Sequence, residues 1–224
     1  MLEKFRTAKQ AEIRTLREQA HSGTLPELYP GPRPSFAAAL SRGNRGVVIA
    51  EYKPASPSRG VIRQDIRPRE MARIYRSSGA GALSVLTEAR YFQSSLTFLR
   101  EMAGVGLPLL RKDFLFDRLQ VRQTAATPAS ALLLIARMFS FEPETLTGML
   151  REAQRYGLEA VVEIFDASDL ALARRAGAEI FQVNNRDLSS LEVDLDNSRT
   201  LILGKRDHEI WIAASGFSRA VEVR

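Results

Sequence analysis

Short apolar runs alternate with longer amphipathic stretches along most of this chain. Seven runs have the composition of buried strands, and each except the last precedes a segment of helical length. The expected strands are residues 47–51, 82–86, 107–112, 131–135, 160–164, 179–183 and 209–214. The expected helices after them are residues 68–78, 94–104, 117–126, 142–156, 167–176 and 194–203. Continuous apolar strands alternating with helices predict an α/β protein whose parallel sheet is covered on both faces.

The N-terminal part of the chain has a different pattern. Residues 2–20 are expected to form an amphipathic helix. Its apolar positions among charged and polar residues are Leu2, Phe5, Ile13 and Leu16. A Pro-rich connector over residues 26–34 leads into a short helix over 35–41. We therefore expect an N-terminal helical extension, residues 1–45, followed by one main domain, residues 46–224.

Two architectures could hold seven parallel strands. The intervals between strands are close to one unit of an eight-fold barrel, which predicts a (βα)8 TIM-barrel type of fold with only seven strands in this chain. An open, doubly wound sheet is the alternative. It would favour a Gly-x-Gly-x-x-Gly turn after the first strand, and this turn is absent there.

Composition excludes several kinds of chemistry. The 224 residues contain no cysteine and only two histidines, His21 and His208, so thiolate sites and His-based triads have almost nothing to be built from. Acid and base groups must then come from lysines and carboxylates. The net charge of +6 comes from scattered arginines without a nucleic-acid reader motif. No apolar run is long enough to span a membrane, and we expect a cytoplasmic protein that binds neither nucleic acid nor membrane.

Polar residues stand where the expected strands end. Glu51 and Lys53 lie two residues apart after an apolar run, so they share a face of the strand. Four more residues stand at other strand ends and share a face with the residue two positions before them. They are Lys112 with Leu110, Glu163 with Val161, Asn184 with Gln182 and Ser215 with Ala213. In a parallel barrel these ends meet at one mouth. Two lysines and two glutamates brought together there could hold each other's pKa values apart and act as acid and base.

Each of these residues also has an ordinary structural interpretation. A lysine or glutamate at a strand end can simply mark where the chain reaches solvent. Asn184 and Asn185 can form a turn, and Ser56, Ser58 and Gly216 can be plain loop residues. The joint pattern favours a site over these separate interpretations.

The same segments resemble indole-3-glycerol phosphate synthase, a (βα)8-barrel family of tryptophan biosynthesis. The strongest matches are Ile49-Ala-Glu-Tyr-Lys-Pro-Ala-Ser-Pro-Ser-Arg-Gly60 and Val183-Asn-Asn-Arg-Asp-Leu188. Further matches are residues 83–88, 91–92, 110–114, 133–135, 162–163, 192–195 and 215–216. The resemblance runs collinearly from about residue 33 to the end of the chain.

Membership would imply a reaction and a set of roles. The substrate would be 1-(2-carboxyphenylamino)-1-deoxyribulose 5-phosphate, closed to indole-3-glycerol phosphate with loss of CO2 and water and without metal or organic cofactor. Lys112 resembles the general acid and Glu163 the acid/base partner, with Glu51 and Lys53 assisting. The implied substrate contacts are Phe92, Phe114 and Leu133 for the ring, Asn184 and Arg186 for the carboxylate and a sugar hydroxyl, and Ser56, Ser215 and Gly216 for phosphate and sugar.

The chain departs from the family pattern in three places. Ala214 stands where relatives commonly have a glutamate, and Ser94 where many have glycine. The chain also stops at Arg224, before the eighth strand and its helix, so we expect a fragment or a naturally short protein. A partner chain, self-association or the N-terminal helix would then cover the gap.

The same residues are compatible with other functions. One is a catalytically impaired or inactive remnant of the same fold, or an interaction subunit. Another is a different phosphate-binding barrel, such as the isomerase of the same pathway, but that enzyme needs a cysteine.

Overall fold

A computed structural model describes residues 2–42, 46–57, 59–187, 192–217 and 219 of this chain. Seven strands form one parallel sheet in the order β1-β4-β5-β6-β7-β8-β9. Their bounds are Ile49–Tyr52 (β1), Ala82–Leu86 (β4), Leu109–Lys112 (β5), Ala131–Ile135 (β6), Glu159–Ile164 (β7), Ile180–Asn184 (β8) and Ile210–Ala214 (β9). A two-stranded hairpin, β2 (Ala55–Ser56) and β3 (Gly60–Val61), interrupts the loop after β1.

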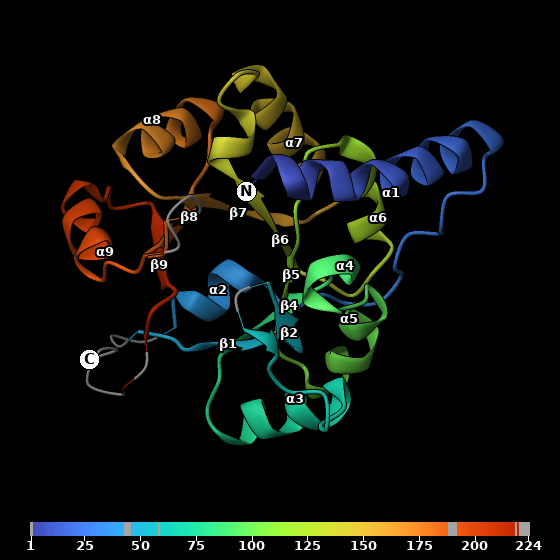
Figure 1. Cartoon of the computed structure of the whole chain (residues 1–224), viewed down its shortest axis with the longest axis horizontal. Coiled ribbons are helices and arrows are strands. Elements are labelled where there is room, and N and C mark those ends of the chain that lie inside the picture. The colour runs from blue at the N-terminus through green and yellow to red at the C-terminus, as the bar shows by residue number, and fades with distance from the viewer. Residues whose placement is uncertain (1, 43–45, 58, 188–191, 218, 220–224) are drawn as a thin grey trace.

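Helices surround the outside of the curled sheet (Figure 1). They are α3 (Pro68–Ser77), α4 (Ala89–Phe92), α5 (Thr97–Met102), α6 (Arg118–Ala125), α7 (Pro143–Arg155), α8 (Ala167–Ala176) and α9 (Asp196–Leu201), with short 3-10 turns η1 (Ala103–Val105), η2 (Ala136–Phe139) and η3 (Ile202–Gly204). Every residue of β4, β6 and β8 is buried, because the barrel interior covers one face and the helices cover the other. This two-sided burial explains why these strands have nearly uninterrupted apolar sequences.

The predicted alternation of strands and helices is confirmed, with two local differences. The helix expected over 94–104 forms α5 and the 3-10 turn η1, and a separate short helix, α4, precedes that range. The Glu88 carboxylate accepts hydrogen bonds from the backbone N–H groups of residues 90, 91 and 92 and so starts α4 early, and Gln93, with φ at +50°, ends it. The β2–β3 hairpin was not anticipated, since its Ser/Pro sequence carries no strand pattern.

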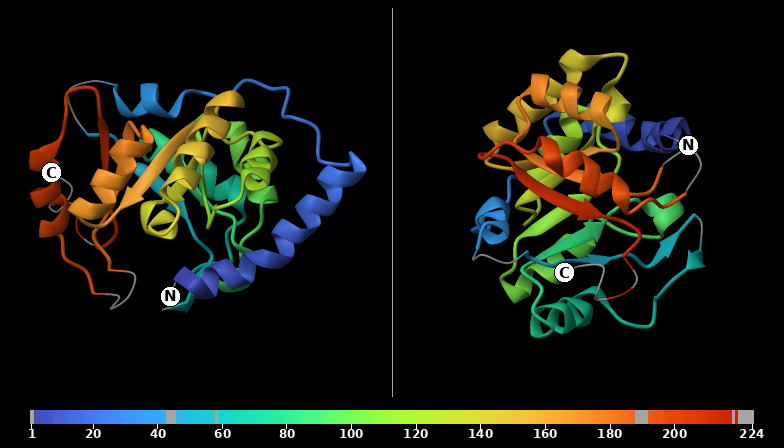
Figure 2. Two further views of the ribbon diagram at one scale, coloured as in Figure 1. Left: turned by 90° about the horizontal axis from the view of Figure 1, so that it is seen from above. Right: turned by 90° about the vertical axis from the view of Figure 1, so that its left-hand side faces the viewer.

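Two helices precede the first strand and lie at opposite ends of the sheet (Figure 2). The first, α1 (Leu2–Ser22), contacts the C-terminal strand ends, where Arg6 donates a hydrogen bond to the Met138 carbonyl. The second, α2 (Phe36–Leu40), lies at the N-terminal ends. The carboxylate of Glu159, the first residue of β7, accepts bonds from the first N–H groups of α2 and holds that helix in place. The C-terminal end of the sheet is therefore the end that α1 covers.

The sheet curls in the manner of a TIM barrel but does not close. Among the described strands, β1 and β9 each pair with a single neighbour, so both are edges. Many side chains of β9 are only half-buried, whereas the matching positions of β8 are fully buried. The expectation of seven parallel strands is confirmed, and the described residues contain no eighth.

Candidate active site

A buried ion pair joins β5 to β7 at the C-terminal end of the sheet. Lys112 Nζ lies 3.2 Å from Glu163 Oε2, and their side chains are 21% and 5% exposed. Lys112 ends β5, and Glu163 is the next-to-last residue of β7, which places both at the mouth that the strand-end pattern predicted. Buried charges of this kind are costly unless they are paired and hydrogen-bonded.

A second ion pair stands at the C-terminal end of β1. Glu51 Oε1 lies 2.7 Å from Lys53 Nζ, as expected for side chains on the same face of a strand. The other oxygen of Glu51 accepts a 3.4 Å hydrogen bond from Ser84, its register partner on β4. Tyr75 of α3 donates to the Glu51 backbone carbonyl at 2.9 Å, which ties this strand to the surrounding helix. The strand end that carries Glu51 is thus held by two neighbouring elements.

The charges of the two pairs act on one another. Burial alone would raise the pKa of Glu51, but the ammonium groups of Lys112 and Lys53 bring it below its ordinary value of 4.5. Burial alone would lower the pKa of Lys112, but the carboxylates of Glu163 and Glu51 raise it above 10.5. The negative charges of both carboxylates therefore favour the protonated form of Lys112.

Neighbouring amides orient Glu163. Gln182, its register partner on β8, donates to Glu163 Oε2 at 2.7 Å, and Asn184 donates to Oε1 at 3.1 Å. Asn184 is held in turn, because its Oδ1 accepts the backbone N–H of Arg186 at 3.0 Å. Both oxygens of Glu163 are thus fixed by three donors when the Lys112 ammonium is counted.

Aromatic side chains line the same end of the sheet. Phe92 and Phe114, predicted as ring contacts, have ring centroids 6.2 Å apart, and Leu133 lies in the same apolar cluster. Phe5 of α1 stacks on Phe114 with centroids 3.8 Å apart and planes 9° from parallel, and it also contacts Phe92. The N-terminal helix therefore supplies one wall of this apolar region.

The predicted phosphate contacts come from two separate loops. Ser56 lies on the β2–β3 hairpin, where its Oγ accepts the N–H of Arg59 at 3.2 Å. Ser215 and Gly216 follow β9, and both have positive φ angles, +69° and +86°. A Cβ on Gly216 would come within 2.3 Å of the Val193 side chain, so the turn requires glycine for space as well as for backbone angle. Ser58 and Leu188, which belong to the resembling motifs, lie outside the described residues.

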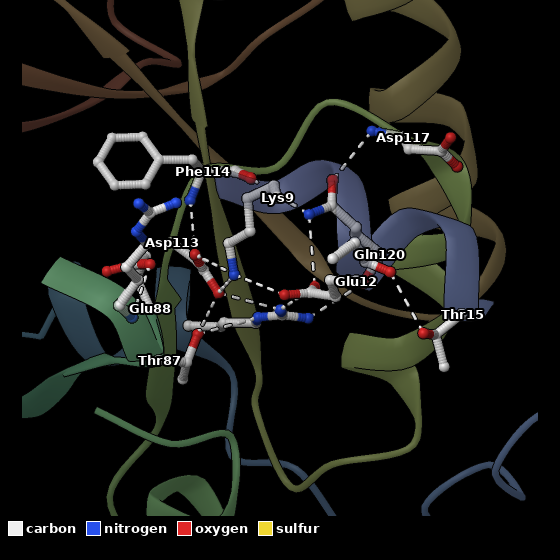
Figure 3. Close-up of polar contacts among 12 residues, drawn as sticks. Lys9, Glu12, Thr15, Thr87, Glu88, Asp113, Phe114, Asp117 and Gln120 are labelled. Carbon is white, nitrogen blue, oxygen red and sulfur yellow. Dashed lines mark hydrogen bonds and ion pairs between the residues drawn. The ribbon is translucent and has the colours of Figure 1, made fainter. Parts of the chain in front are cut away.

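A buried polar network ties α1 to this end of the sheet (Figure 3). Lys9 Nζ lies 2.7 Å from Asp113 Oδ1 and 2.7 Å from Glu12 Oε2. Asp113, with a fully buried side chain, also accepts from Arg111 at 3.1 Å and from Thr87 at 2.6 Å. Burial would raise the pKa of Asp113, but the cations of Lys9 and Arg111 lower it below 3.8. Asp113 directly follows Lys112, so this network fixes the chain beside the general-acid candidate.

Sequence reasoning missed the residues that orient the charged groups. Gln182 could have been found, because it shares a face with Asn184 one pleat before the strand end. Ser84, Tyr75 and Phe5 carried no such signal, since each occupies an ordinary position in a buried strand or an amphipathic helix. Only the packing of elements distant in sequence makes them neighbours of the site.

The described residues contain no group of three or more His, Cys, Asp or Glu side chains placed to hold a metal ion. None of the helices found in this part of the chain has both the length and the apolar character needed to cross a membrane.

The curled parallel sheet, with paired lysine and glutamate side chains at its C-terminal strand ends, places this chain in the class of barrel-like βα proteins. The family model for indole-3-glycerol phosphate synthase matches residues 2–224, and the chain belongs to that family.

Named relatives agree with this family. The indole-3-glycerol phosphate synthase of Geobacillus thermodenitrificans is 40% identical over 228 residues, which cover 100% of this chain and 85% of the relative. That of Chlorobium chlorochromatii is also 40% identical, covering 99% of this chain and 88% of the relative. Identity of this extent and coverage goes well beyond a similarity of fold.

Distant solved structures share the fold alone. A deoxyribose phosphate aldolase from Aeropyrum pernix aligns with a TM-score of 0.56 at 16% identity, covering 78% of each chain. A structure titled native KDPGal aligns with a TM-score of 0.51 at 14% identity, covering 76% of this chain and 72% of the other. Such likeness supports the barrel-like architecture and carries no information on substrate.

Proposed function

We propose that this chain catalyses the formation of indole-3-glycerol phosphate in tryptophan biosynthesis. Its substrate would be 1-(2-carboxyphenylamino)-1-deoxyribulose 5-phosphate, which closes its five-membered ring with loss of CO2 and water. The family membership supports the reaction, and one observation in the site carries the proposal: Lys112 lies against Glu163 and within the field of Glu51.

Lys112 is the proposed general acid. Ring closure places negative charge on the ketose oxygen as the aromatic carbon attacks the carbonyl carbon, and a nearby ammonium group can deliver a proton to that oxygen. Loss of CO2 then restores the electron pair to the ring. Because two carboxylates stabilise the charged form of Lys112, the acid is present throughout the neutral range.

Glu163 is the proposed partner for dehydration. This half of the reaction removes the hydroxyl group as water, and a hydrogen leaves the adjoining position as a proton. Glu163 lies within proton-transfer distance of Lys112, and Gln182 and Asn184 fix both of its oxygens. Glu51 on β1 and Lys53, which directly follows this strand, assist by holding charge within the field of Lys112.

The remaining predicted residues bind the substrate in this proposal. Phe92, Phe114 and Leu133 form the apolar wall for the anthranilate ring, where packing sets the angle of attack. Arg186 and Asn184 contact the substrate carboxylate and a sugar hydroxyl. Ser56, Ser215 and the backbone of Gly216 contact the phosphate and sugar.

Turnover of the purified chain tests the proposal. We expect indole-type fluorescence to appear with this substrate, and Lys112→Met to slow it by roughly a hundredfold or more, because methionine keeps the apolar stem but donates no proton. Lys205→Met is the matched control, since Lys205 is an exposed lysine beyond α9. Product formation at the same rate in both variants, or none above background in the parent, would contradict the proposal.

The two open edges support a second, independent proposal about assembly. We propose that the chain self-associates so that β1 and β9 gain strand partners, because unpaired strand edges expose N–H and C=O groups that readily bind another chain. Light scattering across a concentration series tests this. A monomer at every concentration would contradict it.

A further inference from the structure

Arg137 joins three loops at the end of the sheet that carries Lys112 and Glu163. It lies in η2, directly after β6, and contacts three carboxylates. Its Nη2 lies 2.6 Å from Asp166, its Nε 3.0 Å from Asp169 and its Nη1 3.6 Å from Asp187. Asp166 and Asp169 follow β7, whereas Asp187 follows β8. A single guanidinium therefore spans the exits of three consecutive strands.

Two of these contacts are anchored on α8. Asp166 caps the helix, because its carboxylate accepts the N–H groups of Ser168 and Asp169. Asp169 also accepts the N–H of Phe165, and the Arg137 guanidinium lies over the Phe165 ring at 4.5 Å. Arg137 is thus held rigidly on the side of β7.

The third contact reaches the turn that carries predicted substrate ligands. Asp187 directly follows Arg186, whose N–H donates to Asn184, and Asn184 donates to Glu163. The N–H of Asp187 donates to the Glu192 carbonyl at 3.0 Å, which fixes the other side of the turn. A contact that holds Asp187 therefore acts on Arg186 beside it and, through the Arg186 N–H, on the Asn184 side chain.

The geometry favours arginine at this position. The planar guanidinium carries its donors on three separate nitrogens, each of which lies against a different carboxylate here, whereas all three donors of an ammonium leave from one atom. Asp166 and Asp169 alone would already hold a structural ion pair, so the reach to Asp187 is the feature that a stabilising role does not explain.

We propose that Arg137 is a positioning residue of the active site, which acts through Asp187 to hold Asn184 and Arg186 against the substrate. This inference rests on the proposed function. The chain offers a matched control at the opposite end of the sheet, where Arg174 of α8 makes a comparable two-bond ion pair with Glu209 before β9.

Steady-state kinetics and amide hydrogen exchange on the full chain test the inference. Arg137→Gln is expected to raise KM by about tenfold or more with a smaller change in kcat, since displaced substrate contacts weaken binding. Arg137→Lys is expected to have a KM that is nearly as high as that of Arg137→Gln. Arg174→Gln is expected to lower the melting temperature and leave KM unchanged. A folded Arg137→Gln with the parent KM would overturn the inference.

Hydrogen exchange keeps this test separate from that of the function itself. Arg137→Gln is expected to speed exchange at the amides of residues 186 and 187, and Arg174→Gln is not. This readout needs no turnover, so an inactive parent would refute the proposed function and leave the exchange test of Arg137 standing. Unchanged exchange at both amides would overturn the inference. If Arg137→Gln does not fold, Asp187→Asn keeps the contacts to Asp166 and Asp169 and should raise KM similarly.

Discussion

Lys9 on the first helix lies 2.7 Å from Asp113, and Asp113 is the residue that follows Lys112 at the end of β5. The two side chains are 5% and 0% exposed, and they are 104 residues apart in sequence. This contact, together with the stacking of Phe5 on Phe114, makes the N-terminal helix part of the mouth of the sheet.

Lys9→Met is expected to destabilise the fold by about 3 kcal/mol, because it leaves the Asp113 carboxylate buried with one cation fewer. Urea unfolding measures this change. Gln10→Met is the control on the same helix, since residue 10 is exposed and should change stability little. Adding Asp113→Asn to Lys9→Met should cost less than the sum of the two single changes. Equal costs for the residue 9 and residue 10 variants would contradict the assignment.

Glu163→Gln is expected to lower kcat by about a hundredfold to ten-thousandfold, because the amide cannot transfer the proton and places a donor against Gln182 or Asn184. The control is Glu159→Gln at the other end of the same strand. Glu159 holds α2, so its loss should reduce stability without a comparable fall in kcat. Similar kcat values for the two variants would argue against a catalytic Glu163.

The dependence of kcat/KM on pH should be flat from about pH 7 to about pH 9.5, above the range in which a substrate phosphate titrates. Lys112 has its pKa raised above 10.5 and stays protonated in this range, whereas Glu51 has its pKa lowered below 4.5 and stays ionised. Stopped assays in matched buffers provide the profile. A fall in kcat/KM centred near pH 8 would contradict this prediction, because it would mean that Lys112 loses its proton at a lower pH than its two neighbouring carboxylates allow.

Glu209 is expected to stabilise the fold above pH 4.5 and to lose that effect in acid. Its hydrogen bonds to Arg174 outweigh burial and lower its pKa to about 2. A carboxyl whose pKa is depressed in the folded state contributes fully above its unfolded pKa, and the contribution falls as the pH drops toward the folded value. Its partner Arg174 is partly exposed to solvent, so we expect a contribution of about 1–2 kcal/mol after solvent screening. Urea unfolding of Glu209→Gln and of the parent at pH 7 and at about pH 3 measures this contribution. The difference in unfolding free energy between the two proteins should be smaller at the lower pH.

The hydrophobic pattern of the sequence by itself determined the order of the strands and helices. It also determined that the charged residues lie at the C-terminal ends of the strands. Side chains alternate along a strand, so Glu51 and Lys53 had to share a face, and the structure pairs them at 2.7 Å. The parallel arrangement likewise required Lys112 and Glu163 to lie at the same end of the sheet. Local rules of this kind act between residues close in sequence or on neighbouring strands.

Only the tertiary structure decided which residues distant in sequence form ion pairs with each charged side chain. Lys9 stands four residues from Phe5 and from Ile13, so its spacing puts it on the apolar face of the helix, but nothing near it in the sequence identifies Asp113 as its partner. The same holds for Arg137, whose three carboxylate partners become neighbours only when β6, β7 and β8 lie side by side. Packing of this kind depends on the summed contacts of the whole curled sheet, and no short stretch of sequence encodes it.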